Sequence, residues 1–366
     1  MTLNFRCNFF SKSHVLKAAI FILFCLNTSP VISQSGRVYE FLNLPSSARI
    51  TAIGGYGIPD TEHDLDMALF YPSLVNKKMH QNLSLNFVDY FDDIHYGTAA
   101  YSHTFENYGS FTGRVHYISY GKFDETDETG RELGTFGAGE YAAVIGWGRQ
   151  LSDHFFIGSN LKIIGSDFYE YNSFGVAVDV SGSYINHEEL FSASLLFRNI
   201  GRQITTYHSG NNEPIPFEIV AGVSKELENA PFRLFSVAHN LQKYDLTYND
   251  YNRQSYSVPQ QNSSGDNGVE DFASLLMHHF IMGIEFIPTD NLSFRMGYNY
   301  RRRQEMKVES RLSTVGFSWG LGVKISDFHF SYGRADHHLA GSPNHITVSF
   351  NVDDILGGRR IEVNNE

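Results

Sequence analysis

The last part of the chain repeats one pattern, in which apolar and polar residues alternate strictly along short segments. Its apolar members in the first segment are Leu292, Phe294, Met296, Tyr298 and Tyr300. The stretches 314–325 and 345–352 repeat the pattern. Because successive side chains of a β-strand point to opposite faces, each segment has one aromatic, apolar face and one small or polar face. Lipid outside and a polar lumen inside account for both, so we expect an all-β fold, a transmembrane antiparallel β-barrel.

The faces of the segment 314–325 make this expectation specific. Phe317 and Leu321 fall on the apolar face, whereas Ser318 and Gly320 fall on the small face. An arginine at either apolar position would have to enter lipid, at a cost of ~2–4 kcal/mol near the bilayer midplane. On the small face, Ser318→Asn or Gly320→Asn is expected to cost much less.

The start of the chain has the composition of an export signal. Basic residues at positions 6, 12 and 17 precede an apolar run at 18–26 and a stretch of small residues. This predicts a signal peptide over residues 1–33, with cleavage between 33 and 36. The run is about half the ~20 residues that a spanning helix needs, and no later run approaches that length, which excludes a helical membrane protein. Cys7 and Cys25 both lie in the signal, so the mature chain forms no disulfide and no thiol site.

Composition agrees with a barrel and limits its partners. Mean hydropathy is -0.26, aromatic residues make up 14% and glycines number 32, as a polar lumen with aromatic girdles requires. The net charge is -12, with no sustained basic stripe, so we expect no nucleic-acid partner. The basic cluster Arg301-Arg302-Arg303 is interpreted as the base of a loop beside lipid headgroups or anionic surface sugar, in preference to a specific ligand site.

The connections between the segments sort by length. About fourteen alternating segments lie between residues 81 and 352, and short turns alternate with long polar loops at 121–138, 201–215, 244–277, 301–311 and 334–344. Outer-membrane barrels have tight turns on the periplasmic side and long loops outside. We therefore expect an integral protein of the cell outer membrane with extracellular long loops. Both termini, including a tail at 353–366, are expected in the periplasm.

Residues 37–80 precede the first strand and do not alternate. Their mixture of turn residues and short apolar pieces is too apolar for a solvated tail, which predicts an N-terminal plug in the lumen. The candidate plug residues are Asn43, Pro45, Arg49, Gly54, Gly55, Asp66 and Pro72. A guanidinium in a partly dry lumen needs an acceptor, and inward-facing Asp179, Glu218 or Glu285 could bind Arg49.

The long loop at 244–277 is the candidate partner-docking surface. Tyrosine and amide side chains, the composition that protein-binding loops favour, recur in it, and the candidate contacts are Tyr248, Tyr251, Asn252 and Tyr256. A flexible extracellular loop without a partner is the alternative. The stretch 269–277 is apolar enough to fold over the barrel mouth as a lid.

Patterns for other chemistry are weak, so we expect no catalytic residue, no metal site and no cofactor. No nucleophile lies in a recognisable turn near a histidine. His278-His279 and Asp336-His337-His338 are interpreted as solvated or interfacial residues, because adjacent side chains of a strand point to opposite faces. The acidic stretch 124–128 lacks the ligand spacing of a calcium loop.

An ordered set of short motifs resembles a known family. The stretch FLNLPSSARITAIGG at 41–55 is similar to the N-terminal signature of the PorV/PorQ family, FadL-like barrels of Bacteroidetes. DLDMALFYPSL at 64–74 is similar to a family segment that ends in Asn-Pro-Ala-Leu, with Tyr71 in place of the asparagine. The motifs of the PorQ branch are YGKF at 120–123 with DETG at 127–130, RNIGRQ at 198–203, and PIPF at 214–217.

This resemblance implies a fourteen-stranded, non-enzymatic barrel of the type IX secretion system. It would belong to the cell-surface attachment complex that handles exported proteins. The implied partners are a PorZ-like surface protein, PorU- and PorV-like proteins, and lipopolysaccharide. The alternative function is a FadL-like channel for hydrophobic small molecules, which needs an apolar pocket inside the barrel.

Overall fold

The computed structural model describes residues 37–208, 210–246, 268–306, 314–336 and 341–356. The predicted signal peptide lies outside the described residues. So do the four candidate docking residues Tyr248, Tyr251, Asn252 and Tyr256, and most of the predicted tail.

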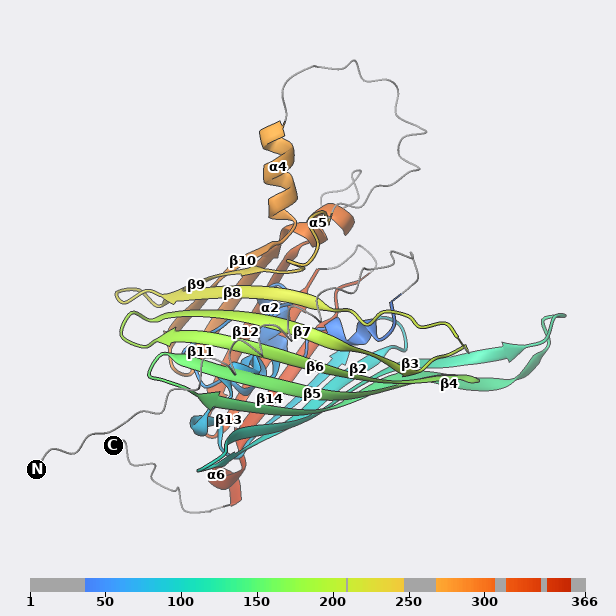
Figure 1. Cartoon of the computed structure of the whole chain (residues 1–366), viewed down its shortest axis with the longest axis horizontal. Helices are drawn as coiled ribbons and strands as arrows, with labels where there is room; N and C mark the ends of the chain where they lie inside the picture. The colour runs from blue at the N-terminus through green and yellow to red at the C-terminus, as the bar shows by residue number, and fades with distance from the viewer. Residues whose placement is uncertain (1–36, 209, 247–267, 307–313, 337–340, 357–366) are drawn as a thin grey trace, which may run out of the picture. The chain divides into compact units, whose positions relative to one another are not determined.

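Fourteen antiparallel strands close into a barrel, in which each strand pairs with its neighbours in sequence. The barrel closes where β1 (Asn82–Asp89) pairs with β14 (Asn344–Asn351), with Leu85 opposite Val348. The strands between them are β2 (His95–Phe105), β3 (Gly109–Thr126), β4 (Glu132–Gln150), β5 (Phe155–Phe168), β6 (Tyr171–Asn186), β7 (Phe191–Thr205), β8 (Glu218–Glu226), β9 (Phe232–Ala238), β10 (Phe280–Thr289), β11 (Leu292–Asn299), β12 (Phe317–Ile325) and β13 (Phe328–Ala335). The expected fold class and strand number are confirmed (Figure 1).

Burial alternates along the strands as the sequence pattern predicts. In β11 and β12 the outward side chains of Phe294, Met296, Phe317 and Trp319 are 45% to 56% exposed, whereas the residues between them are buried. This exposed apolar band is the outer surface that lipid requires. Among the described residues no helix is long and apolar enough to cross a membrane.

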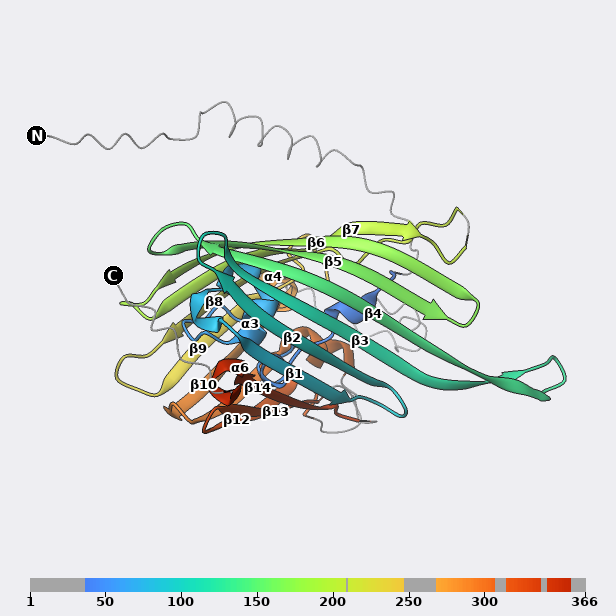
Figure 2. The same ribbon diagram turned by 90° about the horizontal axis from the view of Figure 1, so that it is seen from below.

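The connections sort to the two ends of the barrel as expected, but the bounds of the long loops need correction. Residues 201–205 of the expected loop 201–215 belong to β7, and two larger differences follow. Most of the expected loop 121–138 is strand: β3 and β4 continue past their neighbours as a two-stranded ribbon that projects from the barrel (Figure 2). The two strands of the ribbon remain paired along its length, and Phe123 stacks on Phe136 across them. Asp127 closes the turn by accepting bonds from the backbone of Thr129 and Arg131.

The second of these differences concerns the loop at 301–311. Tyr300 and Arg301 do not continue β11 but begin helix α5 (Tyr300–Met306). Val315, expected on the lipid face, is buried, since the chain turns at Gly316 and β12 starts only at Phe317.

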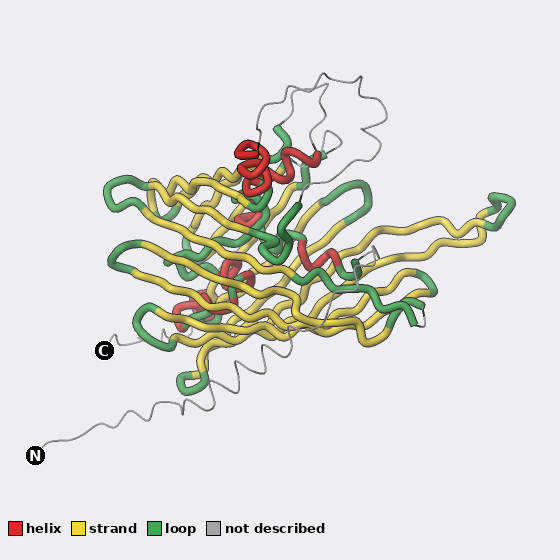
Figure 3. The backbone as a smooth tube through the Cα atoms, turned by 45° about the horizontal axis from the view of Figure 1, so that its top comes forward, coloured by secondary structure: helices red, strands yellow, loops and turns green. Residues whose placement is uncertain are grey.

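Residues 37–80 lie inside the barrel as short helices joined by turns (Figure 3). The elements are η1 (Glu40–Asn43), α2 (Ala48–Ala52), α3 (Leu65–Phe70), η2 (Pro72–Leu74) and η3 (Lys77–Met79). Helix α2 packs against β11, β12, β13 and β14, and η2 packs against β4, β5 and β6. We call residues 37–80 the N-terminal segment.

The N-terminal segment begins at the long-loop end of the lumen and joins β1 at the short-turn end. The backbone of Val38 binds Pro214 in the long β7–β8 connection at 3.2 Å. At the other end the Gln81 carbonyl accepts a bond from Val352, beside the end of β14. The first described residues therefore lie at the long-loop end, whereas the side of the membrane on which the two termini lie stays a prediction.

Helix α4 (Gly268–Met277) is the described part of the expected docking loop. Phe272 and Leu276 are 52% and 43% exposed, so the helix does not bury these side chains against the barrel as a packed lid would. Helix α6 (Val352–Leu356) follows β14 directly and begins the predicted tail.

Candidate functional site: the N-terminal segment in the barrel lumen

Polar caps start the two α-helices of the N-terminal segment. The Ser47 side chain accepts a bond from the backbone of Ile50, and the Asp64 side chain accepts one from Asp66 at 2.8 Å. These bonds satisfy amide groups that a helix start leaves without partners. Every residue of α2 is buried, and Ile50, Ile53 and other apolar residues of the segment form a core inside the barrel.

Glycines on the inner wall make room for the segment. A Cβ atom added at Gly333 would overlap the Ala48 carbonyl, and one at Gly158 would overlap the backbone of Pro72. A Cβ at Gly320 would overlap the side chain of Ala52. The small inner face that the sequence shows is therefore occupied by the segment. A larger residue at position 320 must therefore displace Ala52, a cost that the sequence pattern does not indicate.

The centre of the contact is a buried ion pair between Arg49 of α2 and Glu285 of β10. Arg49 Nε lies 2.9 Å from Glu285 Oε1, and Nη2 lies 2.7 Å from Oε2, a bidentate arrangement. Arg49 Nη1 also lies 2.6 Å from Asp64 and 2.7 Å from Asp60. Of the three carboxylates that the sequence offers to Arg49, the structure selects Glu285.

Glu285 also binds two arginines of the barrel wall. Arg233 Nη1 lies 2.6 Å from Glu285 Oε2, and Arg295 Nε lies 2.9 Å from Oε1. Arg233 reaches Glu62 as well, at 2.8 Å. We call Arg49, Arg233, Arg295 and Glu285 with Asp60, Glu62 and Asp64 the ionic cluster. It contains three cations and four carboxylates and joins the N-terminal segment to β9, β10 and β11.

Burial sets the protonation of two carboxyl groups in the N-terminal segment. It raises the pKa of Asp60 to about 8, although Arg49 and Arg233 oppose the shift. Burial and the nearby Asp64 raise the pKa of Asp66 to about 7, and Ser84 donates to the Asp66 carboxyl at 2.7 Å. At neutral pH Asp60 is therefore mainly protonated, which brings the charges of the ionic cluster into balance.

The ionic cluster borders a polar cavity at the short-turn end of the barrel. This cavity has a volume of about 460 Å³. Its lining includes Glu62 and Asp64 of the segment, Lys324 of β12, and Asp327 of the β12–β13 turn. Solvent at this end therefore reaches the edge of the cluster, while Glu285 stays fully buried.

The other two carboxylates offered to Arg49 have partners of their own. Asp179 binds Lys162 at 2.8 Å. Glu218 accepts a bond from the Tyr56 hydroxyl at 2.6 Å and lies 3.6 Å from Arg198. Tyr56 belongs to the N-terminal segment, so Glu218 also joins the segment to the wall.

The remaining candidate plug residues are distributed along the segment. Asn43 binds Glu40 at 2.8 Å, Pro45 lines a small internal cavity, and Pro72 starts η2. Gly54 and Gly55 have φ of 104° and 100°, values that favour glycine and end α2 with a turn.

The basic cluster at 301–303 divides between two environments. Arg301 pairs with Glu305 at 2.7 Å on the surface of α5. Arg302 points inward and binds the Gly54 carbonyl at 3.3 Å. Our interpretation of the whole cluster as a loop base facing headgroups is therefore wrong for Arg302, because α5 turns this side chain towards the segment.

The histidine pairs also differ from expectation. His278 and His279 are buried and not solvated, with Nδ1 atoms 2.7 Å from the Ser274 carbonyl and 2.9 Å from the His239 carbonyl. Asp336 is described, whereas His337 and His338 lie outside the described residues. In the described part of the chain no three potential ligands group around a common point for a metal ion.

The sequence did not single out Arg233 or Asp60, although both are central. Arg233 could have been indicated by its position, because it is a charged residue on the inward face of an alternating segment. Arg295 has the same kind of position. Asp60 lies in a turn without periodicity, and only the fold of the segment brings it to Arg49.

Comparison with known proteins finds solved structures of similar fold but assigns this chain to no family. No family model and no curated sequence matches the chain. The Pseudomonas putida toluene transporter TodX aligns with 9% identity and a TM-score of 0.49, over 84% of this chain and 96% of its own. A Pseudomonas aeruginosa FadL homologue aligns with 9% identity and a TM-score of 0.45, covering 84% and 98%. The CymD monoaromatic hydrocarbon channel has 11% identity and a TM-score of 0.43, covering 84% and 97%. At these values the fold rests on the strand pairing described above.

Proposed function

We propose that this protein is a non-enzymatic outer-membrane barrel, closed by its N-terminal segment, that binds a partner protein with the long-loop end. The observation that supports closure most directly is the Arg49–Glu285 pair, which fixes the segment in the middle of the lumen. Beside the segment, the cavity that contacts Pro45 and Arg198 has a volume of only about 20 Å³. Such a space is too small for an organic substrate.

Two parts of the long-loop end could bind the partner. The β3–β4 ribbon extends beyond β2 and β5, so both of its outer edges carry unpaired backbone groups. The loop at 244–277 contributes Tyr248 and Tyr251, which are large contact side chains by type. The resemblance to the PorV/PorQ family makes the surface attachment complex of the type IX secretion system the favoured setting, with a PorZ-like protein as the partner.

The second candidate function is a channel for hydrophobic small molecules. It requires displacement of the N-terminal segment and an apolar path. Arg114, Lys162 and Arg198 line the internal cavity, which disfavours a hydrophobic substrate. The channel therefore ranks below the docking function.

The partner test is recovery of the complex from native membranes. We expect that shortening residues 246–268 to a Gly-Ser linker, or replacing residues 122–137 by a tight turn, reduces recovery of a surface protein. The matched control is a Gly-Ser replacement in the short turn at 326–327, at the opposite end. Undiminished recovery with both long-loop variants would refute docking at this end.

Closure is tested separately by conductance in planar bilayers. The intact barrel should not conduct, and removal of residues 37–80 should open a pore without preventing strand assembly. An assembled deletion variant that stays impermeable would refute the plug. Uptake of a hydrophobic solute by the intact barrel would instead support the channel, whatever the Arg49→Met variant does.

A further inference from the structure

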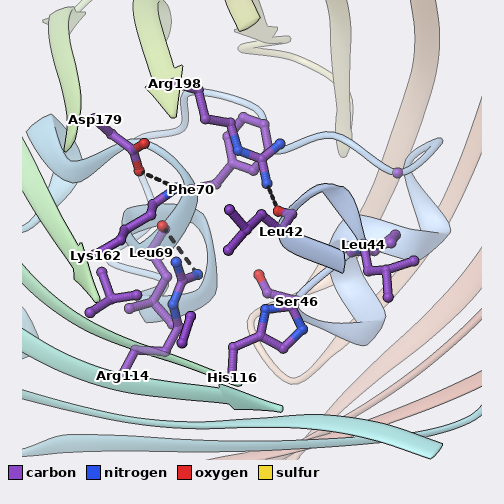
Figure 4. A pocket seen from close by; sticks show the side chains of 14 residues that line it. Leu42, Leu44, Ser46, Leu69, Phe70, Arg114, His116, Lys162, Asp179 and Arg198 are labelled. Atoms are coloured by element: carbon purple, nitrogen blue, oxygen red, sulfur yellow. Dashed lines mark hydrogen bonds and ion pairs between the residues drawn. The ribbon is translucent and has the colours of Figure 1, made fainter. Parts of the chain in front are cut away.

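A small internal cavity lies between the N-terminal segment and the inner wall. On the wall side β3 contributes Arg114 and His116, β5 contributes Lys162, and β7 contributes Arg198. On the segment side the cavity contacts Leu42, Ser46, Leu69 and Phe70. Figure 4 shows the guanidinium groups of Arg114 and Arg198 and the His116 ring around one space. Its volume of about 20 Å³ fits one water molecule or one monatomic ion.

Two of the three cations at this cavity have carboxylate partners. Lys162 Nζ lies 2.8 Å from Asp179 and also donates to Asn199 at 2.7 Å. Asp179 is fully engaged, because it accepts bonds from the Asn160 side chain and the Asn199 backbone as well. Arg198 lies 3.6 Å from Glu218 and donates to the Leu42 carbonyl.

Arg114 has no such partner. Among the described residues no carboxylate oxygen lies within ion-pair distance of it, and its contact is a long bond from Nη1 to the Leu69 carbonyl at 3.5 Å. Its Nε–H is buried without an acceptor. The cavity therefore carries one positive charge more than its carboxylates balance, at a place where an uncompensated charge is costly.

His116 supplies a second unsatisfied group at the same place. His116 is only 4% exposed, and its Nε2 atom has no hydrogen-bond partner among the described residues. Arg114 and His116 are two residues apart on β3, so both face the lumen from one strand. Two polar groups from the wall are thus directed to the cavity without a protein acceptor.

We propose that this cavity binds a single monatomic anion, chloride, with Arg114 as its principal ligand. Chloride supplies the missing negative charge and accepts the Arg114 Nε–H bond. The volume excludes phosphate and organic carboxylates. Because Arg114 binds Leu69 and Arg198 binds Leu42, both on the N-terminal segment, the bound ion would stabilise the seated segment. A water molecule would fill the same volume but would leave the charge uncompensated.

The first experiment locates the ion directly. Crystals of the full-length barrel, grown with bromide in place of chloride, are measured at the bromine absorption edge. We expect an anomalous peak between Arg114, His116 and Arg198. Absence of a peak there, with ordered water density instead, would overturn the proposal. This experiment needs no variant and therefore does not depend on whether a variant folds.

The second experiment measures the consequence in solution. The unfolding midpoint of the detergent-solubilised protein is compared in chloride and in gluconate, an anion too large for the cavity, at equal ionic strength. A ligand that binds the folded state raises the midpoint with the logarithm of its concentration. We expect this rise in the unaltered protein and in Arg301→Gln, a surface control, and its loss in Arg114→Gln. The same difference between salts in all three proteins would show a general salt effect and refute the site.

Discussion

Glu285 of β10 binds Arg49 of α2 through both of its carboxylate oxygens, at 2.9 and 2.7 Å, and so joins the barrel wall to the N-terminal segment. The two residues are 236 positions apart in the chain. The pair is therefore a tertiary contact that forms only when the segment packs against β10. It holds the segment in place inside a wall whose own closure is the pairing of β1 with β14.

The first prediction concerns this ion pair. Arg49→Met removes one partner of a buried pair and leaves carboxylates uncompensated, which typically costs about 3–5 kcal/mol. We expect faster hydrogen exchange of residues 37–80, measured by mass spectrometry, with little change in the strands. Arg301→Gln, which breaks a surface pair, is the control. The double variant Arg49→Met/Glu285→Gln should lose less than the sum of the single losses, and strict additivity would contradict direct coupling.

The second prediction is a pH dependence that arises from Asp60. The folded pKa of about 8 lies above the unfolded value of 3.8, so the folded protein binds more protons between these values. The stabilising contribution is complete below pH ~4 and is lost as the pH rises through about 8. Buried histidines such as His63, whose pKa burial lowers to about 4, contribute the opposite slope, so the prediction concerns the difference between two proteins. From pH 5 to pH 8 the unfolding midpoint of the unaltered protein should fall relative to that of Asp60→Asn, while Asp66, with a pKa of about 7, contributes equally to both. A relative gain of the unaltered protein over this range would contradict the assignment.

The third prediction tests the fit between wall and segment. Gly333→Val places a branched side chain where the Ala48 carbonyl lies, whereas Gly113→Val extends into open space. Valine suits a strand in both cases. Gly333→Val should therefore loosen or exclude the segment and accelerate hydrogen exchange of residues 37–80, while the strands still assemble. Gly113→Val should leave that exchange unchanged. Equal behaviour of the two variants would mean that the segment does not occupy the lumen as described.

The fourth prediction separates the two faces of β12. Phe317→Arg puts a charge on the exposed apolar face and should cost ~2–4 kcal/mol near the bilayer midplane, seen as impaired membrane insertion. Gly320→Asn acts on the inner face, where Ala52 leaves no room. It should permit insertion but accelerate hydrogen exchange of residues 37–80. Impaired insertion in both variants would show that the faces are not distinct.

The fifth prediction concerns topology. Since Val38 lies beside the long β7–β8 connection, an epitope inserted before Arg37 should be accessible from the same side of the membrane as an epitope in the β3–β4 turn. An epitope in the turn at 326–327 should be accessible only from the other side. Antibody labelling of intact and permeabilised cells distinguishes these outcomes. If the β3–β4 turn is labelled in intact cells but the epitope before Arg37 is protected, the two lie on opposite sides of the membrane, which would contradict the prediction.

The alternating pattern determined the barrel, its strand number and the orientation of side chains within the strands, because strand periodicity and the contrast between lipid and lumen are local properties. It placed Phe317 outward and Arg295 inward, and it identified Arg49 as a residue in need of an acceptor. Only the tertiary structure decided which acceptor it finds. Glu285, Asp179 and Glu218 are equivalent inward carboxylates in sequence, and the path of the N-terminal segment brings Glu285 alone of the three to Arg49. The direction of that path, the inward turn of Arg302 and the overlap at Gly320 depend on packing between residues far apart in the chain, which no local pattern encodes.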